Sequence, residues 1–226
     1  MSEQAWLQEY PAGIPNEIDL DEFSSVVDIF ESSCTEYADR VAYENFGATL
    51  SYAELDRKSA AFGAYLQSLG LERGDRVAIM LPNLLQYPIA LFGVLRAGLV
   101  VVNTNPLYTA RELKHQLNDS GARAIVVLEN FAHTLDTVIG DCPACEHVFV
   151  TGVGDLLGFP KGSLINFVLR HVKKEVPAYN LPGAVRFPAA LKAGEAKSLE
   201  RPALNHEDLA FLQYTGGTTG VSKGAM

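Results

Sequence analysis

The stretch RVAIMLPNLLQYPIALFGVLRAGLVVVN, residues 76–103, has the pattern that decides the fold. Its first part, Arg76–Leu81, is an apolar run of the length expected for a buried strand. Pro88–Ala97 is longer, starts with proline and stops at Gly98, which is typical of a buried helix. Leu99–Asn103 is a second buried strand. Strand, helix and strand in that order predict a β-α-β unit with parallel strands.

Polar capping residues mark further helices on both sides of this unit. A serine at position 24 or 25 can cap a first helix. The capping box Ser51–Glu54 opens a helix that should end near Gly70. A second capping box, Thr109–Glu112, opens a helix that should close at Gly121.

Three more apolar runs have the length and composition of buried strands, and they alternate with the capped helices. The runs are Ala124–Leu128, His147–Thr151 and Leu209–Gln213. Prolines and glycines break the rhythm between residues 152 and 201, and we expect an irregular excursion there. The alternation predicts an α/β fold that is doubly wound, with a mostly parallel sheet covered on both faces.

Length, charge and composition exclude several classes of protein. The 226 residues carry a net charge of −9, whereas a nucleic-acid binder needs a basic surface. The most apolar stretch, Pro88–Val102, is interrupted by Arg96 and is shorter than the roughly 20 residues that span a bilayer. Met1–Tyr10 lacks the basic and apolar regions of a secretory signal. We expect a cytoplasmic protein that contacts no nucleic acid.

Three cysteines are too few for a disulfide framework, which agrees with a reducing compartment. Cys142 and Cys145 form a C-x-x-C pair, but a predicted strand follows them instead of a helix, and no second pair has zinc-site spacing. We interpret them as ordinary loop cysteines. A redox protein built on this pair is the alternative, which lowered thiol pKa values would favour.

The eleven residues YTGGTTGVSKG, Tyr214–Gly224, follow the last predicted strand. Glycines let backbone N–H groups come close to an anion, and threonine hydroxyls add donors without bulk. Lys223 supplies a positive charge for terminal phosphates. The run predicts a loop that binds polyphosphate. A glycine-rich surface loop or a hairpin connection is the alternative.

This run resembles the phosphate-binding signature of the adenylate-forming enzymes, which include acyl-CoA synthetases, luciferases and peptide-synthetase adenylation domains. Ser222 departs from that signature, which usually has proline or alanine there. Other stretches look like the bacterial long-chain fatty-acid–CoA ligases, so the resemblance covers nearly the whole chain. They are Tyr10–Pro15, Leu81–Asn83, Val102–Glu112 and His115–Ala122.

The resemblance implies an enzyme that activates a fatty acid with ATP to an acyl-adenylate and then transfers the acyl group to CoA. The threonines would donate to phosphate oxygens, the glycines would admit the phosphates to the backbone, and Lys223 would follow the departing pyrophosphate. The residues expected to bind ATP are Tyr214, Thr215, Gly216, Gly217, Thr218, Thr219, Gly220, Lys223 and Gly224.

Members of this family are much longer than 226 residues. We therefore expect residues 1–226 to be an incomplete N-terminal part of the AMP-binding domain, truncated just after the phosphate loop. The ligand of Mg²⁺ and the catalytic lysine would lie beyond residue 226, so these residues alone should be inactive. We assign no catalytic or metal-binding residue within them, and we give no role to the histidines, which are His115, His133, His147, His171 and His206.

Two other functions stay open beside the fatty-acid ligase. One is another adenylate-former, for a medium-chain or an aryl acid, because the acyl pocket should lie mostly outside this sequence. The other is a non-catalytic module that binds nucleotide. The expected partners are a long-chain fatty acid, CoA and a second copy of the chain in a homodimer.

Residues 162–174 are locally basic, with apolar residues at helical spacing. Such a helix can lie on an anionic membrane surface, which would make the protein peripheral on the inner face of the membrane. The alternative, which we favour, is an amphipathic helix that packs on its own domain. Removal of Arg170, Lys173 and Lys174 should weaken vesicle binding if the membrane interpretation is right.

Overall fold

The computed structural model describes the chain except for residues 1–5, 7–8, 16 and 216–221. One sheet has the strand order β7-β6-β5-β3-β4-β8-β9. Its neighbouring strands are parallel, apart from β8 and β9, which are antiparallel. The strands are β3 (Arg76–Met80), β4 (Val100–Asn103), β5 (Ala122–Leu128), β6 (His147–Thr151), β7 (Val185–Arg186), β8 (Phe211–Thr215) and β9 (Lys223–Ala225).

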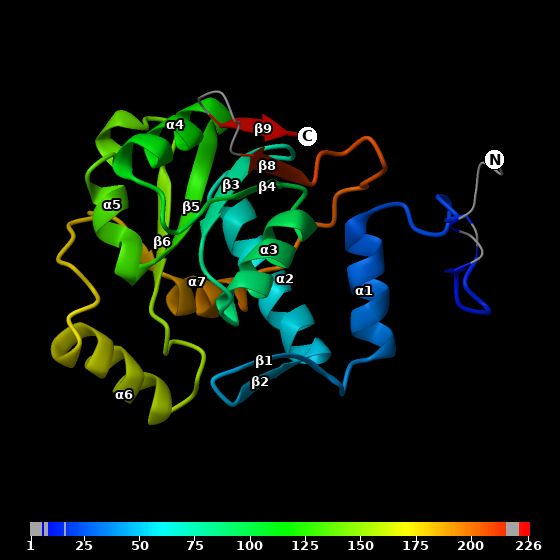
Figure 1. Ribbon diagram of the computed structural model, residues 1–226, viewed down its shortest axis with the longest axis horizontal. Coiled ribbons are helices and arrows are strands. Elements are labelled where there is room, and N and C mark those ends of the chain that lie inside the picture. The colour runs from blue at the N-terminus through cyan, green and yellow to red at the C-terminus, as the bar shows by residue number, and fades with distance from the viewer. Residues whose placement is uncertain (1–5, 7–8, 16, 216–221) are drawn as a thin grey trace.

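Helices cover both faces of this sheet, as the doubly wound prediction requires (Figure 1). One face carries α1 (Val26–Glu36), α2 (Tyr52–Ser68), α3 (Gln86–Arg96) and α7 (Phe187–Gly194). The other face carries α4 (Ala110–Ser120) and α5 (Ala132–Asp136).

Alternation along β3 explains the two layers. Val77 and Ile79 face the cluster beneath α2, α3 and α7, whereas Ala78 and Met80 face the cluster beneath α4 and α5. All four are at most 1% exposed, because a parallel strand covered on both faces is apolar throughout. The short apolar run forms a buried strand, as the sequence predicts, and the structure places it in the middle of the sheet.

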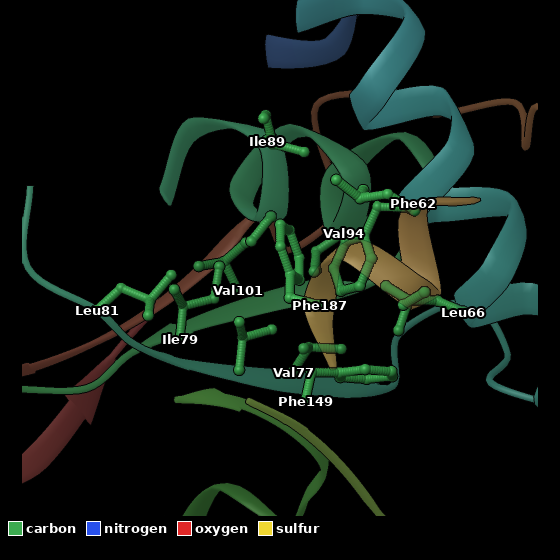
Figure 2. Close-up of a cluster of buried hydrophobic side chains, with 14 of the residues drawn as sticks. Phe62, Leu66, Val77, Ile79, Leu81, Ile89, Val94, Val101, Phe149 and Phe187 are labelled. Carbon is green, nitrogen blue, oxygen red and sulfur yellow. The ribbon is translucent and has the colours of Figure 1, made fainter. Parts of the chain in front are cut away.

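An aromatic cluster joins the elements on the first face. Figure 2 shows Phe62 of α2 beside Phe149 of β6 and Phe187 of α7. The ring centroids of Phe62 lie 5.4 Å from those of Phe149, in a T-shaped contact, and 4.9 Å from those of Phe187. Full burial of a phenylalanine side chain stabilises a fold by about 1.5–3 kcal/mol. This cluster ties α7, which is late in the chain, to the first layer.

The capping residues mark the helix starts that the sequence predicts. Ser25 caps α1, and both capping boxes form, at Ser51 with Glu54 and at Thr109 with Glu112. Helix α4 ends at Gly121, whose φ of 58° is the left-handed conformation that favours glycine at this position.

The arginine that interrupts the most apolar stretch is buried. Arg96 is 2% exposed, and its guanidinium forms ion pairs of 2.9 Å with Glu31 of α1 and Asp56 of α2. A buried arginine requires such partners, because desolvation without them costs several kcal/mol. Arg96 thereby joins α3 to α1 and α2.

The structure contains elements that the sequence did not indicate. A hairpin of β1 (Val41–Asn45) and β2 (Ala48–Ser51) turns at Phe46 and Gly47, both with positive φ, which is the two-residue turn that suits hairpins. The segment 152–201, expected to be irregular, contains β7 and α7. It also contains α6 (Lys161–Phe167) with a π-helical continuation (Val168–Val172), where the helical spacing of residues 162–174 indicates an amphipathic helix. Its prolines and glycines lie mostly between these elements.

Candidate functional site

The carboxyl ends of β3, β4 and β8 meet at one edge of the sheet, which is where ligands bind in open α/β sheets. A cavity of about 520 Å³ opens there. Amide and hydroxyl side chains supply most of its polar groups. The lining residues include Asn83, Tyr87, Asn103, Asn105, Tyr108, Gln213 and Tyr214.

Hydrogen bonds connect the last residues of neighbouring strands at this edge. Asn103, at the end of β4, accepts from the Tyr87 hydroxyl at 2.8 Å and donates to the side-chain oxygen of Gln213 at 3.1 Å. Gln116 of α4 donates to the Asn103 carbonyl at 2.9 Å. Asn105 caps the following turn by accepting from the Leu107 amide. These contacts show that polar residues at the end of β4 and in the following loop serve the local structure, by bonding neighbouring elements and capping a turn.

Strands β8 and β9 hold the predicted phosphate loop between them. Thr215 pairs with Lys223, and Tyr214 pairs with Gly224. Residues 216–221, with the expected phosphate contacts Gly216, Gly217, Thr218, Thr219 and Gly220, lie outside the described residues.

The prediction that the loop begins at Tyr214 is corrected, because β8 continues through Tyr214 and Thr215. The hairpin that was named above as an alternative to a phosphate loop is therefore present, and β8 and β9 are its two arms. Pairing with β9 extends β8 past the apolar run that the sequence shows. An antiparallel pair of arms is compatible with an anion-binding segment between them, since the paired residues of the arms are Gln213–Thr215 and Lys223–Ala225.

The side chains of the two arms differ in their surroundings. Thr215 and Lys223 are exposed, so a hydroxyl and an ammonium group reach solvent on paired residues. Tyr214 is 7% exposed, and its hydroxyl donates to Asp119 of α4 at 2.6 Å. Burial, followed by this bond to a carboxylate, raises the pKa of Tyr214, so the hydroxyl stays protonated and donating.

Gly224 lies under the ring of Tyr214. A Cβ at position 224 would lie 3.1 Å from the Tyr214 ring, which is closer than such contacts normally are. The ring cannot move aside freely, because it is buried and its hydroxyl is bonded to α4. Glycine at this position has a packing reason in the structure, apart from any contact with phosphate.

The histidine and the aspartate of α4 that touch the hairpin were missed from the sequence. His115 Nε2 lies 3.1 Å from the carbonyl of Ser222, and Asp119 receives the Tyr214 bond. The two residues are four apart, so they share one face of α4. The spacing of four residues was the signal available in the sequence. The contacts of these two side chains with residues about a hundred positions later could not be predicted, because they leave no local pattern.

Cys142 and Cys145 do not have the properties of a redox pair. Both are buried, and burial raises the pKa of Cys142 and raises that of Cys145 to about 12. A reactive thiol needs a lowered pKa and some exposure. The interpretation as ordinary structural cysteines is supported, and the redox alternative is not.

A network of buried charges lies at the ends of β5, β6 and β7. Glu129 has a side chain that is 1% exposed, and it is ion-paired with Arg170 and with Arg186 at 3.2 Å. Arg186 also binds Asp155 at 2.8 Å, and Asn166 of α6 bonds to Asp155 and to the Gly154 amide. The network fastens α6 and its continuation to the sheet. Arg170 is thus used within the domain, which agrees with the favoured interpretation of a helix that packs on its own domain.

No metal centre is evident among the residues that the structure describes. Outside the undescribed positions, no group of three or more His, Cys, Asp or Glu side chains converges in a way that could hold a metal ion. The donors at this edge are amides, hydroxyls and one ammonium group, a set that fits phosphate oxygens.

Comparison with known families decides the class of this site. The model of the AMP-binding enzymes matches residues 30–226, which include the whole sheet and the hairpin. The chain belongs to the AMP-binding enzyme family. The similarity noted in the eleven-residue run therefore extends over the fold that positions it.

Curated relatives with functional names match nearly the whole of this chain. The chain is 57% identical over 224 residues to a long-chain-fatty-acid–CoA ligase of Escherichia coli O157:H7, covering 99% of this chain and 40% of the relative. It is 36% identical over 232 residues to a ligase of the same name from Bacillus subtilis strain 168, again covering 40% of the relative. This AMP-binding chain thus spans 40% of the length of these relatives.

Solved structures show the same fold at lower identity. An anthranilate CoA ligase, AuaEII, in complex with anthranoyl-AMP matches with a TM-score of 0.72 at 22% identity, over 92% of this chain and 35% of that one. A putative long-chain-fatty-acid CoA ligase of Rhodopseudomonas palustris CGA009 matches with a TM-score of 0.70 at 16% identity, over 92% and 44%. The α/β fold with a mostly parallel sheet is the fold of adenylate-forming enzymes.

Proposed function

We propose that the protein containing these residues is a long-chain fatty-acid–CoA ligase. A carboxylate oxygen of the fatty acid attacks the α-phosphorus of ATP, and pyrophosphate leaves. The thiol of CoA then attacks the acyl carbonyl, and AMP leaves. The observation that carries this proposal is the 57% identity over nearly the whole chain to a curated enzyme of that name.

The exposed arms of the hairpin support the first step. Thr215 and Lys223 face each other across β8 and β9, and both reach solvent at the carboxyl edge of the sheet. A hydroxyl and an ammonium group there can hold the triphosphate and follow the charge that develops on pyrophosphate. In this proposal Mg²⁺ accompanies the nucleotide, and its protein ligand belongs to the remainder of the enzyme.

A series of acids tests the proposal on the protein expressed from its complete reading frame. We expect ATP–pyrophosphate exchange to rise from acetate to palmitate, because each buried methylene adds roughly 0.8 kcal/mol of binding. Exchange driven better by anthranilate or another aryl acid would favour the alternative ligase. Exchange with no acid, in a protein that binds ATP, would favour the nucleotide-binding module.

We also propose that the helix α6 and its continuation contact an anionic membrane surface, from which a ligase could collect its substrate. Four large apolar side chains of this region are 57–90% exposed. Phe159 lies just before α6, and Leu164, Phe167 and Val172 lie on α6 and its continuation. Lysines 161, 173 and 174 lie beside them in the chain. The structure describes no helix long and apolar enough to cross a membrane. A homodimer in the cytoplasm stays a prediction.

Vesicles containing phosphatidylglycerol test the membrane contact. Each lysine near such a surface contributes about 1 kcal/mol, so the double change Lys173→Ala and Lys174→Ala should weaken binding roughly 30-fold. Arg170 is left intact, because its loss would disturb the ion pair with Glu129. Lys192→Ala, on α7, is the matched control. Equal binding of all variants, or equal binding to neutral vesicles, would contradict the contact.

A further inference from the structure

The second arm of the hairpin, β9, has little support within the sheet, whereas β8 is also held by its parallel pairing with β4. In the described part of the chain β9 is the last strand of the sheet, and it pairs with β8 alone. Its three residues are exposed. A strand of three residues with a single neighbour has few ladder hydrogen bonds to hold it. Contacts from outside the ladder can therefore fix the position of β9 against β8.

Helix α4 supplies two contacts of that kind, one to each arm. Before the turn, the Tyr214 hydroxyl donates to Asp119 at 2.6 Å. After the turn, His115 Nε2 lies 3.1 Å from the Ser222 carbonyl. A carbonyl only accepts, so Nε2 must carry the proton in this contact. The spacing of four residues puts both groups on one face of α4.

The helix itself is firmly placed. Leu113 and Leu117 of α4 are at most 1% exposed in the cluster under the second face of the sheet. Gln116 is fully buried and donates to the carbonyl at the end of β4. The two polar contacts therefore connect the arms of the hairpin to a firmly packed helix, which is how a binding site is held ready for its ligand.

We propose that His115 and Asp119 are positioning residues that clamp the phosphate hairpin for a nucleoside triphosphate. This inference rests on the proposed function and deepens it. His115 and Asp119 need touch no phosphate. They keep the arms at the separation that lets Thr215 and Lys223 act together, so less of the binding energy of ATP is lost to positioning the two arms.

Binding of ATP with Mg²⁺ to the full-length protein, measured by calorimetry, tests the clamp. Loss of one hydrogen bond should weaken the affinity about three- to tenfold, so His115→Ala and Asp119→Ala should each raise the Kd for ATP by that factor. His115→Gln should restore the Kd to within about twofold, because its amide N–H can donate to Ser222. The melting temperatures should stay alike, and the KM for the fatty acid should not change.

Lys114→Ala is the matched control on the same helix, since Lys114 pairs with Asp141, which lies outside the hairpin. Its Kd for ATP should equal that of the wild type. An unchanged Kd in His115→Ala, or no rescue in His115→Gln, would overturn the clamp. If the wild type binds ATP but exchanges pyrophosphate with no acid, the ligase proposal is refuted. The Kd measurements on the variants still test the clamp in that case. A wild type that binds no ATP would overturn both.

Discussion

The change Lys223→Ala should lower kcat/KM for ATP in the pyrophosphate-exchange reaction about 100-fold to 1,000-fold. Lys223 is exposed on β9 opposite Thr215, at the edge of the sheet where the triphosphate is proposed to lie. Loss of a fixed donor to developing negative charge typically has this effect, because the charge in the transition state is then less well neutralised. Lys223→Arg should recover only part of the activity, since a planar guanidinium replaces a compact ammonium.

Single-turnover rates, compared with the thermal midpoint of each variant, separate this effect from unfolding. The thermal midpoint of Lys223→Ala should match that of the wild type, because an exposed side chain contributes little to stability. Lys192→Ala removes a similar exposed lysine on α7 and should leave the exchange rate unchanged. A loss of less than about threefold in Lys223→Ala would rule out a phosphate role for this residue.

The change Arg186→Ala should destabilise the end of the sheet by about 3 kcal/mol. Arg186 binds Glu129 and Asp155, whose side chains are 1% and 9% exposed. Removal of one partner from a buried pair typically costs 3–5 kcal/mol. We expect the lower value, because Arg186 is itself 39% exposed and Arg170 still pairs with Glu129.

Amide hydrogen exchange locates this second effect. A loss of 3 kcal/mol corresponds to about a 100-fold rise in the exchange rates of amides that open with α6 and β7. Arg57→Ala breaks an ion pair with Glu195 in which both side chains are about half exposed, and it should alter these rates little. Protection of α6 that is equal in Arg186→Ala and the wild type would show that the network does not fasten this helix.

Local signals in the sequence account for most of the fold. Apolar runs predict β3, β4, β5 and β6 to within two residues, because each is buried on both faces. Capping residues predict the starts of α1, α2 and α4, because a helix end must satisfy its own amides. These elements depend on interactions within a few residues of chain.

The elements that escaped prediction depend on distant partners. Strand β7 has two residues and β9 has three, and both become strands by pairing with an existing edge. At the site, the eleven-residue run predicts phosphate chemistry from its composition. The run does not predict that Tyr214 turns inward to Asp119, because that contact depends on the register of β8 against β4.

The place of β8 beside β4 also bears on how the chain folds during synthesis. Val101 pairs with Phe211, so the outer edge of β4 has no partner until more than a hundred further residues have been made. Such a distant pairing is slow to form, because a long loop must close first. Until then β4 presents an apolar edge to which another nascent chain could add a strand. The strand that leads into the phosphate hairpin therefore also shields the growing protein from aggregation.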